Sequence, residues 1–297
     1  MADVYAYGVI APSTLLVLED DYPNAGGYAE IEGVHHSIGG EAAGGAYVLA
    51  RLGIDTSLDG SWLGDDDSSD RTIEILTSAG VDCSPIARSR TGAVTEVVLS
   101  AGSDRTVFGT YRKALADRAW NDPSEEAVRT SRVVCLDPFF PRSSLQAARW
   151  CRDAGTPYVT VDAAPGSEIA QHAEVLVVSE EYTTRELAIT DPSGVLAAYT
   201  DQCTGLVIYT RGNRDLLYGR SHGPVGSFSP FAVEALDTTG AGDSFRAGVI
   251  YGILRGYADD QLVRTAAAVA ALVCRRFPGV LHSPTEEELV AFLAGNT

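Results

Sequence analysis

Lysine is almost absent from this chain, since Lys113 is the only one among 297 residues. Positive charge therefore comes from arginine, and 22 basic residues against 40 acidic ones leave a formal net charge of −18. A protein this acidic repels phosphate in its average field. We therefore expect neither nucleic acid nor a membrane surface as a partner, and a bound phosphate group would need locally arranged donors.

Paired cysteines and long apolar runs are missing as well. The five cysteines include no C-x-x-C pair, which argues against a zinc site and against a disulfide framework. The apolar runs are too short to cross a bilayer, and no charged and apolar leader opens the sequence. We expect a cytoplasmic protein with reduced thiols.

Three common phosphate-binding motifs are also absent. No G-x-x-x-x-G-K-[ST] string occurs, and the H-R-D and D-F-G strings of protein kinases are missing. The glycine-rich turn near the C-terminus lacks the third glycine of a dinucleotide fingerprint. A nucleotide site in this chain must therefore be of another kind.

Apolar segments alternate between strand and helix patterns along the chain. Val4–Ile10 predicts a strand and Ala42–Leu52 a helix, and the last third is helical from Asp243 to Arg276 and from Pro284 to Ala294. Between them, short runs rich in β-branched residues predict further strands at Val133–Leu136, Tyr158–Val161, Val175–Val178 and Leu206–Tyr209. The alternation predicts an α/β fold with a mostly parallel sheet covered by helices.

Two segments predict strands outside this alternation. Residues 11–37 contain Leu15-Leu16-Val17-Leu18 and Ile31, and Val94–Ser100 with Arg105–Tyr111 predicts a hairpin around a turn at 101–104. These pieces could form a small separate sheet. No low-complexity linker interrupts the sequence, so we expect one principal domain over residues 1–297.

A glycine-rich turn leads directly into a helix at residues 237–248, after a strand-like Phe231–Leu236. At such a turn the unpaired N–H groups of Gly240, Ala241, Gly242 and Asp243 can converge on an anion, helped by the positive end of the helix dipole. The negative charge of Asp243 repels an anion, so its presence at an anion site needs a reason. A role as general base would supply one, because Asp243 could take the proton from an attacking hydroxyl. A helix-capping Asp is the plainer alternative.

The string from Asp237 to Gly248, D-T-T-G-A-G-D-S-F-R-A-G, resembles the second signature of the ribokinase-like (PfkB) carbohydrate kinases. The resemblance implies that Asp243 is the base and that residues 240–242 form the anion hole. It also implies a monovalent-cation site, K⁺, near Asp237, and it places Thr239 beside the nucleotide. Val17–Pro23 further resembles the N-terminal lid of ketohexokinase-like members.

Two other segments resemble family motifs. Thr210-Arg211-Gly212 after a predicted strand is similar to the nucleotide loop, although a plain strand-to-turn junction explains it equally well. Gly39-Gly40 and the helix that follows resemble the first signature, whose glycines lie against the acceptor.

Three motifs depart from the family pattern. Gly44 stands where the family usually has a substrate-binding Asn, and Ala11 and Ser13 stand where an Asn–Asp pair is usual. The resemblance therefore does not extend to ribose-like diol recognition, and the departures fit either altered specificity or lost activity. Ser179 and Tyr182 replace the named residues of the N-x-x-E motif that organises magnesium. Glu181 could serve Mg²⁺ instead, or it is an exposed acid at a helix start.

The resemblance implies a ribokinase-like three-layer α/β/α sandwich with a small β lid from residues 11–37 and 90–112. The implied reaction transfers the γ-phosphoryl group of Mg-ATP to a hydroxyl of a sugar or related polyol. Alternatives are a nucleoside kinase and a non-catalytic, ligand-binding regulator. Lid sheets in this family often pair, which would give a homodimer.

Overall fold

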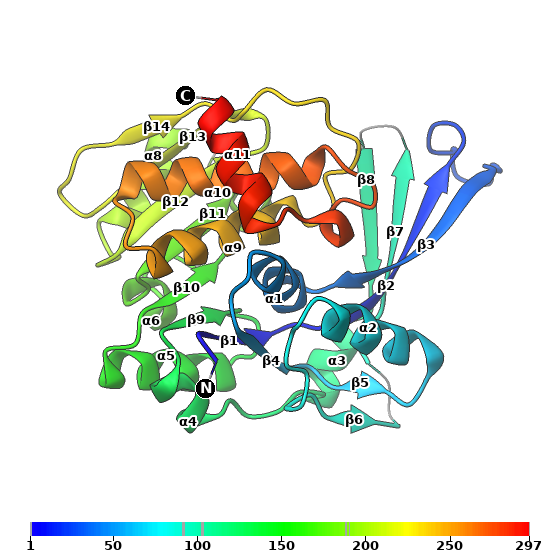
Figure 1. Cartoon of the computed structure of the whole chain (residues 1–297), viewed down its shortest axis with the longest axis horizontal. Coiled ribbons are helices and arrows are strands. Elements are labelled where there is room, and N and C mark those ends of the chain that lie inside the picture. The colour runs from blue at the N-terminus through cyan, green and yellow to red at the C-terminus, as the bar shows by residue number, and fades with distance from the viewer. Residues whose placement is uncertain (1, 91–92, 102–103, 188, 190, 297) are drawn as a thin grey trace.

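An eight-stranded sheet runs through the centre of the computed structural model, which describes residues 2–90, 93–101, 104–187, 189 and 191–296 (Figure 1). Neighbouring strands are parallel except at one edge, where two antiparallel strands are added. In spatial order they are β14 (Gly226–Phe228), β13 (Arg214–Gly219), β12 (Leu206–Arg211), β11 (Val175–Ser179), β10 (Tyr158–Val161), β9 (Val133–Leu136), β1 (Val4–Gly8) and β4 (Thr56–Gly60).

The central strands form where short apolar runs predicted them. β9 and β10 have the predicted bounds, and their side chains are buried on both faces of the sheet, as expected of parallel strands between two helical layers. The prediction of a strand at Phe231–Leu236 was wrong, because this segment has no ladder partner among the described residues. Phe231 instead packs its ring against Phe228 and Phe292, beyond the edge strand β14.

Helices cover both faces of the sheet. One face packs against α1 (Glu41–Arg51), α9 (Ala241–Leu254), α10 (Asp259–Cys274) and α11 (Glu286–Gly295). The other packs against α4 (Glu125–Thr130), α5 (Ser143–Ala154), α6 (Glu168–Gln171) and α8 (Pro192–Thr200). The shorter or peripheral helical pieces are α2 (Asp67–Ser78), α3 (Tyr111–Asp117), α7 (Glu180–Tyr182), the π-helical Thr183–Leu187 and the 3₁₀ turn Val280–His282.

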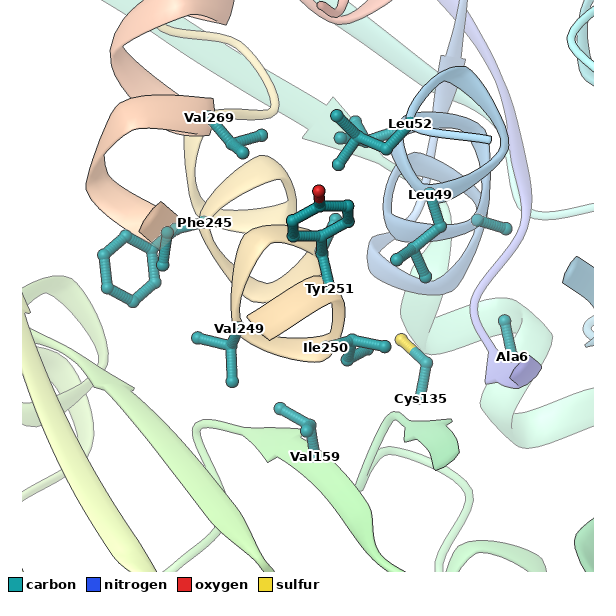
Figure 2. Close-up of a cluster of buried hydrophobic side chains, with 14 of the residues drawn as sticks. Ala6, Leu49, Leu52, Cys135, Val159, Phe245, Val249, Ile250, Tyr251 and Val269 are labelled. Atoms are coloured by element: carbon teal, nitrogen blue, oxygen red, sulfur yellow. The ribbon is translucent and has the colours of Figure 1, made fainter. Parts of the chain in front are cut away.

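Helix α9 lies at the centre of its layer. Figure 2 shows it between Val269 of α10 and Leu49 of α1, with Val249 directed toward Val159 and Ile250 toward Cys135 of the sheet. The helix that follows the glycine-rich turn is therefore held by apolar packing on three sides. This packing gives the first turn of α9 a fixed position.

A second sheet of four strands stands beside the main one (Figure 1). Its order is β3 (Ile31–Gly39), β2 (Ala11–Leu18), β7 (Glu96–Ala101) and β8 (Asp104–Gly109), and a further pair, β5 (Leu63–Gly64) and β6 (Arg88–Ser89), lies apart from it. Residues 102–103 of the predicted turn and 91–92 of the predicted lid lie outside the described residues. The second hairpin strand is shorter than predicted, because Tyr111 begins α3 and folds its ring over Gly109. We call the four-stranded sheet of β3, β2, β7 and β8 the small sheet.

The strand order reverses direction between β1 and β9. After β1 the main sheet continues to β4 on one side, whereas after β9 it continues through β10 to β12 on the other. Loops that leave two adjacent parallel strands in opposite directions open a crevice at the carboxyl ends, which is where open α/β sheets bind ligands. Within the described ranges, no helix is long and apolar enough to span a bilayer.

Candidate active site

The turn before α9 is fixed by Asp237. Its carboxylate accepts hydrogen bonds from Thr239 N and Gly279 N, each at 2.8 Å. Gly240 then takes the left-handed conformation, with φ of 74°, at the N-cap of α9. The predicted turn-to-helix geometry is therefore present, and two backbone donors hold the side chain for which the sequence suggested a cation site.

Backbone donors at this helix start remain open. Among the described residues, no acceptor takes up the N–H groups of Gly242 and Asp243, and a Cβ built on Gly242 would meet open space. Ala241 N, also expected in the anion hole, donates to Thr238 O at 3.2 Å. The structure thus offers Gly242 and Asp243 as free donors at the positive end of α9.

A cavity of about 560 Å³ opens in front of these donors. Of the residues expected at the site, it is lined by Gly39, Gly40, Gly44, Glu181, Thr239, Gly240, Gly242 and Asp243. Six others lie outside its lining: Ser13, Thr210, Arg211, Gly212, Asp237 and Ala241. Ser13 is buried within the small sheet, opposite Ser37 and Glu96, rather than facing the cavity.

The Asp243 carboxyl is poised between its two protonation states. Its pKa is raised to about 7, with burial as the largest cause. Arg246 and Arg105 oppose the rise, whereas the nearby carboxylates of Asp137 and Glu96 add to it. A base whose pKa lies near neutrality combines availability with proton affinity. Asp243 therefore has the position and the electrostatics that a general base needs.

A fully buried ion pair lies behind Asp243 and was missed from the sequence. Arg246 Nη1 contacts Asp137 Oδ1 at 2.6 Å, and both side chains are 0% exposed. Two signals could have found the pair. Arg246 interrupts an apolar helical face, and Asp137 directly follows a buried strand at its carboxyl end.

Two buried polar atoms at the cavity lack partners among the described residues: Glu41 Oε2 and Thr239 Oγ1. Burial raises the pKa of Glu41 well above its usual range, and the neighbouring Asp137 and Asp243 carboxylates add to the rise. Because buried polar groups are normally satisfied, such atoms indicate a place for a ligand. Glu41 was not predicted, although it follows directly after Gly40.

A second cavity of about 610 Å³ adjoins the first and shares Glu41, Asp162, Ser179 and Glu181 with it. Asp162 accepts hydrogen bonds from Ser179 N at 2.7 Å and Ser179 Oγ at 2.9 Å, and burial raises its pKa. Ser179 Oγ also accepts from Tyr182 N at 3.0 Å. The serine that departs from the family motif thus caps α7 and orients a second acid.

Asp162 and Glu181 present the oxygen ligands that Mg²⁺ prefers. Within the described ranges, no cluster of three or more His, Cys, Asp or Glu side chains could hold a metal ion. Mg²⁺ at phosphoryl-transfer sites is usually held by one or two carboxylates together with substrate phosphates. The two acids at the cavities therefore fit such an ion.

The segment expected to bind nucleotide is itself a hairpin turn. Thr210 and Arg211 end β12, and Gly212, with φ of 63°, turns the chain into β13. Arg211 and Arg214 both contact Glu180, the former at 3.8 Å. The positive charges of these two arginines are therefore balanced by Glu180, an acid of the protein itself.

The small sheet reaches the glycine-rich turn through Arg105. Its Nη1 donates to Thr238 Oγ1 at 2.8 Å and also to the Thr238 carbonyl. On the same side, Val98 and Val107 line the cavity, and Tyr111 donates to Glu96 Oε2 at 2.5 Å. The cavity thus lies between the main sheet and the small sheet.

The arrangement suits phosphoryl transfer: free amide donors, an adjacent carboxyl group and a covering sheet lie at the carboxyl edge of a parallel sheet. Comparison with known proteins agrees. Residues 5–286 match the model of the pfkB family of carbohydrate kinases, so the chain belongs to this family and is an enzyme of that class. The predicted family and enzyme class are confirmed.

Relatives cover nearly the whole chain. A protein of Halopiger xanaduensis named ATP-dependent ribose-1-phosphate kinase is 30% identical over 93% of each chain. The crystal structure of a putative ribokinase from Agrobacterium tumefaciens has a TM-score of 0.86 at 24% identity, covering 99% of this chain and 98% of that one. Arabidopsis thaliana ribokinase, complexed with ribose and ATP, gives 0.83 at 20% identity over 98% of both. The predicted ribokinase-like fold is confirmed.

Proposed function

We propose that this protein transfers the γ-phosphoryl group of ATP to a hydroxyl of a sugar or related polyol, with Asp243 as general base. The observation that carries the proposal is the juxtaposition of the Asp243 carboxyl with the free N–H groups of Gly242 and Asp243 at one cavity. Asp243 takes the hydroxyl proton as the oxygen attacks phosphorus, and the bond to the oxygen of ADP breaks. The amides stabilise negative charge on the transferred group.

The two substrates would approach this point from opposite sides. We assign the acceptor to Gly39, Gly40 and Gly44, where backbone rather than side chains lines the cavity. The nucleotide would lie toward Thr239 and the hairpin turn at residues 210–212, and K⁺ beside Asp237. Mg²⁺, held by Asp162, Glu181 and the phosphates, would neutralise charge on the transferred group.

The small sheet would act as a lid of a single domain spanning the chain. Val98 and Val107 line the cavity on one side of it, and Arg105 links it to Thr238. A sheet closed over the acceptor excludes water, which otherwise competes for the phosphoryl group. The opposite side exposes Val34, Val97 and Phe108, which we propose as the contact of a homodimer.

A phosphorylated acceptor is the second candidate. Arg105 lines the cavity of about 560 Å³ to which we assign the acceptor, and among the described residues it forms no ion pair with a carboxylate. Arg185, which also lines this cavity, is paired with Glu181 and Glu186. A guanidinium with free donors suits a phosphate group. The name of the Halopiger relative, a ribose-1-phosphate kinase, points to the same class of acceptor.

An acceptor panel with Mg-ATP and K⁺ tests the proposal: free sugars, polyols, nucleosides and ribose 1-phosphate, with ADP formation as the readout. We expect turnover with a sugar or sugar phosphate, and a loss of at least a hundredfold in kcat for Asp243→Asn, because general-base catalysis contributes about 10²- to 10⁴-fold. The exposed Asp201→Asn is the matched control.

Three outcomes would redirect the assignment. Full kcat in Asp243→Asn would show that Asp243 is not the base. Turnover of nucleosides alone would favour the nucleoside kinase. Binding of a panel compound by calorimetry without ADP formation would favour the non-catalytic regulator.

A further inference from the structure

The first turn of α1 lies directly on the side chains of α9. A Cβ built on Gly44 would stand 3.0 Å from Asp243 Oδ2, and one on Gly45 would stand 3.5 Å from Arg246 Nη2. The former distance is too short to be accommodated without a shift, whereas the latter is an ordinary contact. The absence of a side chain at Gly44 therefore allows Asp243 its present position.

Arg246 links this turn of α1 to the carboxyl ends of two strands. Its guanidinium donates to Asp137 Oδ1 and to the backbone carbonyl of Glu41. The second oxygen, Asp137 Oδ2, accepts from Val9 N at 2.8 Å and from Ala42 N at 3.1 Å. One buried ion pair thus joins the residues after β1 and β9 with the starts of α1 and α9.

A fully buried ion pair needs a reason beyond stability. Removing two charges from water carries a large desolvation cost, and hydrophobic residues of similar volume often stabilise a fold equally well. This pair occupies the switch point of the sheet, and Arg246 follows Asp243 by three residues, so both lie on one face of α9. Its location connects it with the site rather than with the core alone.

We propose that Arg246 and Asp137 are positioning residues for phosphoryl transfer, which fix the first turn of α1 against Asp243 and balance the charge around that carboxyl. The proposal rests on the assignment of Asp243 as the base. The pair itself touches neither substrate in this arrangement: both side chains are fully buried and lie outside the cavity lining. Its effect passes through the geometry of α1 and through the electric field at Asp243.

The two members of the pair act on Asp243 with opposite signs. Arg246 lowers the pKa of Asp243, whereas Asp137 raises it. The other charged or titratable groups that interact with Asp243 are Glu41 from α1, Glu96 from β7, Arg105 from β8, Tyr111 from α3 and Cys135 from β9. Both single variants keep all five of these groups, so the opposite signs of the two shifts follow from the charge that each variant removes.

The pH dependence of kcat/KM is the first test. We expect the acid limb of Arg246→Met to move to higher pH and that of Asp137→Asn to move to lower pH, each by on the order of one pH unit. Arg246→Lys keeps the charge and should leave the limb near its wild-type position. A purely structural role would lower activity in both single variants without moving the limb in opposite directions, and that result would overturn the proposal.

Unfolding measurements test the same pair without any acceptor. Asp243→Asn is added to wild type and to each variant, and the change in unfolding free energy that it causes is measured across a range of pH. The midpoint of this pH dependence reports the titration of Asp243. The midpoint should move upward in Arg246→Met and downward in Asp137→Asn. Unmoved midpoints overturn this proposal and leave the assignment of the base standing. An active Asp243→Asn with shifted midpoints overturns the assignment of the base, and with it the role of the pair in catalysis, whereas the coupling of the pair to Asp243 stands.

The double variant Arg246→Met/Asp137→Asn covers the case in which a single charge left buried prevents folding. It removes both charges, and the Asn oxygen can still accept from Val9 N and Ala42 N. We expect it to fold with a midpoint near that of wild type and to lose at least tenfold in kcat, because the carbonyl of Glu41 loses its donor. Wild-type kcat in the folded double variant would overturn the positioning role.

Discussion

At the scale of single residues, the charge of Asp243 should be visible in the stability of the fold. Its pKa in the folded protein is about 7, above the ordinary value of 3.8. The folded state therefore holds a proton that the unfolded state releases, and stability falls as pH rises between about 4 and 7. Ionised Asp243 thus destabilises the native state.

Asp243→Asn removes this penalty. We expect the variant to gain stability relative to wild type as pH rises from 4 to 8, by roughly 2 to 4 kcal/mol at the upper end. Urea unfolding at intervals across this range measures the difference, with Asp201→Asn as the exposed control. A difference that stays constant with pH would show that Asp243 titrates normally.

Asp243 could be predicted from the sequence and its buried neighbours could not. The proposed base lies within a continuous string whose glycines and following helix act locally, so adjacent residues indicate the role proposed for it. The ion pair of Asp137 and Arg246 joins positions 109 residues apart. No local pattern reports such a pairing, and only an arginine on an apolar helical face indicates that a partner exists.

At the scale of elements, the side chain of Asp237 holds the turn before α9. Asp237 accepts from the backbone N–H groups of Thr239 and Gly279, so it ties the glycine-rich turn to the segment after α10. Nothing in the sequence showed that Gly279 would be a partner, because its segment meets the turn only in the folded chain. The predicted strand at Phe231–Leu236 failed for the same reason, since a ladder needs an edge with which to pair.

Asp237→Ala should loosen this turn. Two charge-assisted hydrogen bonds are lost, so we expect a destabilisation of about 2 to 3 kcal/mol together with a fall of at least tenfold in kcat. Asp66→Ala is the matched control, because Asp66 caps α2 away from the site and should cost about 1 kcal/mol with kcat unchanged. Chemical denaturation measures the loss of stability, and initial rates measure the loss of kcat. A kcat of Asp237→Ala equal to that of wild type would exclude a catalytic role of the turn.

At the scale of the whole molecule, the sequence predicted the layers better than their order. Buried runs such as those of β9 and β10 mark a parallel sheet, because both faces must be covered. The reversal between β1 and β9 that opens the crevice depends on which strands pair with each other. The sequence of a single apolar run does not specify its neighbours in the sheet. The small sheet was predicted as a separate piece, but not the parallel pairing of β2 with β7 that holds its two hairpins together.

The outer side of the small sheet sets the expected assembly. Val34, Val97 and Phe108 are exposed there, with Val97 directly opposite Phe108 in the ladder, and an exposed apolar sheet face favours association. The net charge of −18 works against it, because two copies repel each other. Screening of this repulsion by salt should therefore strengthen the dimer.

Light scattering at 50 mM and 500 mM salt tests this balance. We expect a dimer at micromolar concentration that is tighter at the higher salt, and Phe108→Glu should yield a monomer because it buries a charge in the contact. Val290→Glu places the same charge on the exposed side of α11 and should leave the dimer intact. A wild-type monomer at both salt concentrations would show that the small sheet covers the cavity without a partner, and catalysis would then have to proceed within one chain.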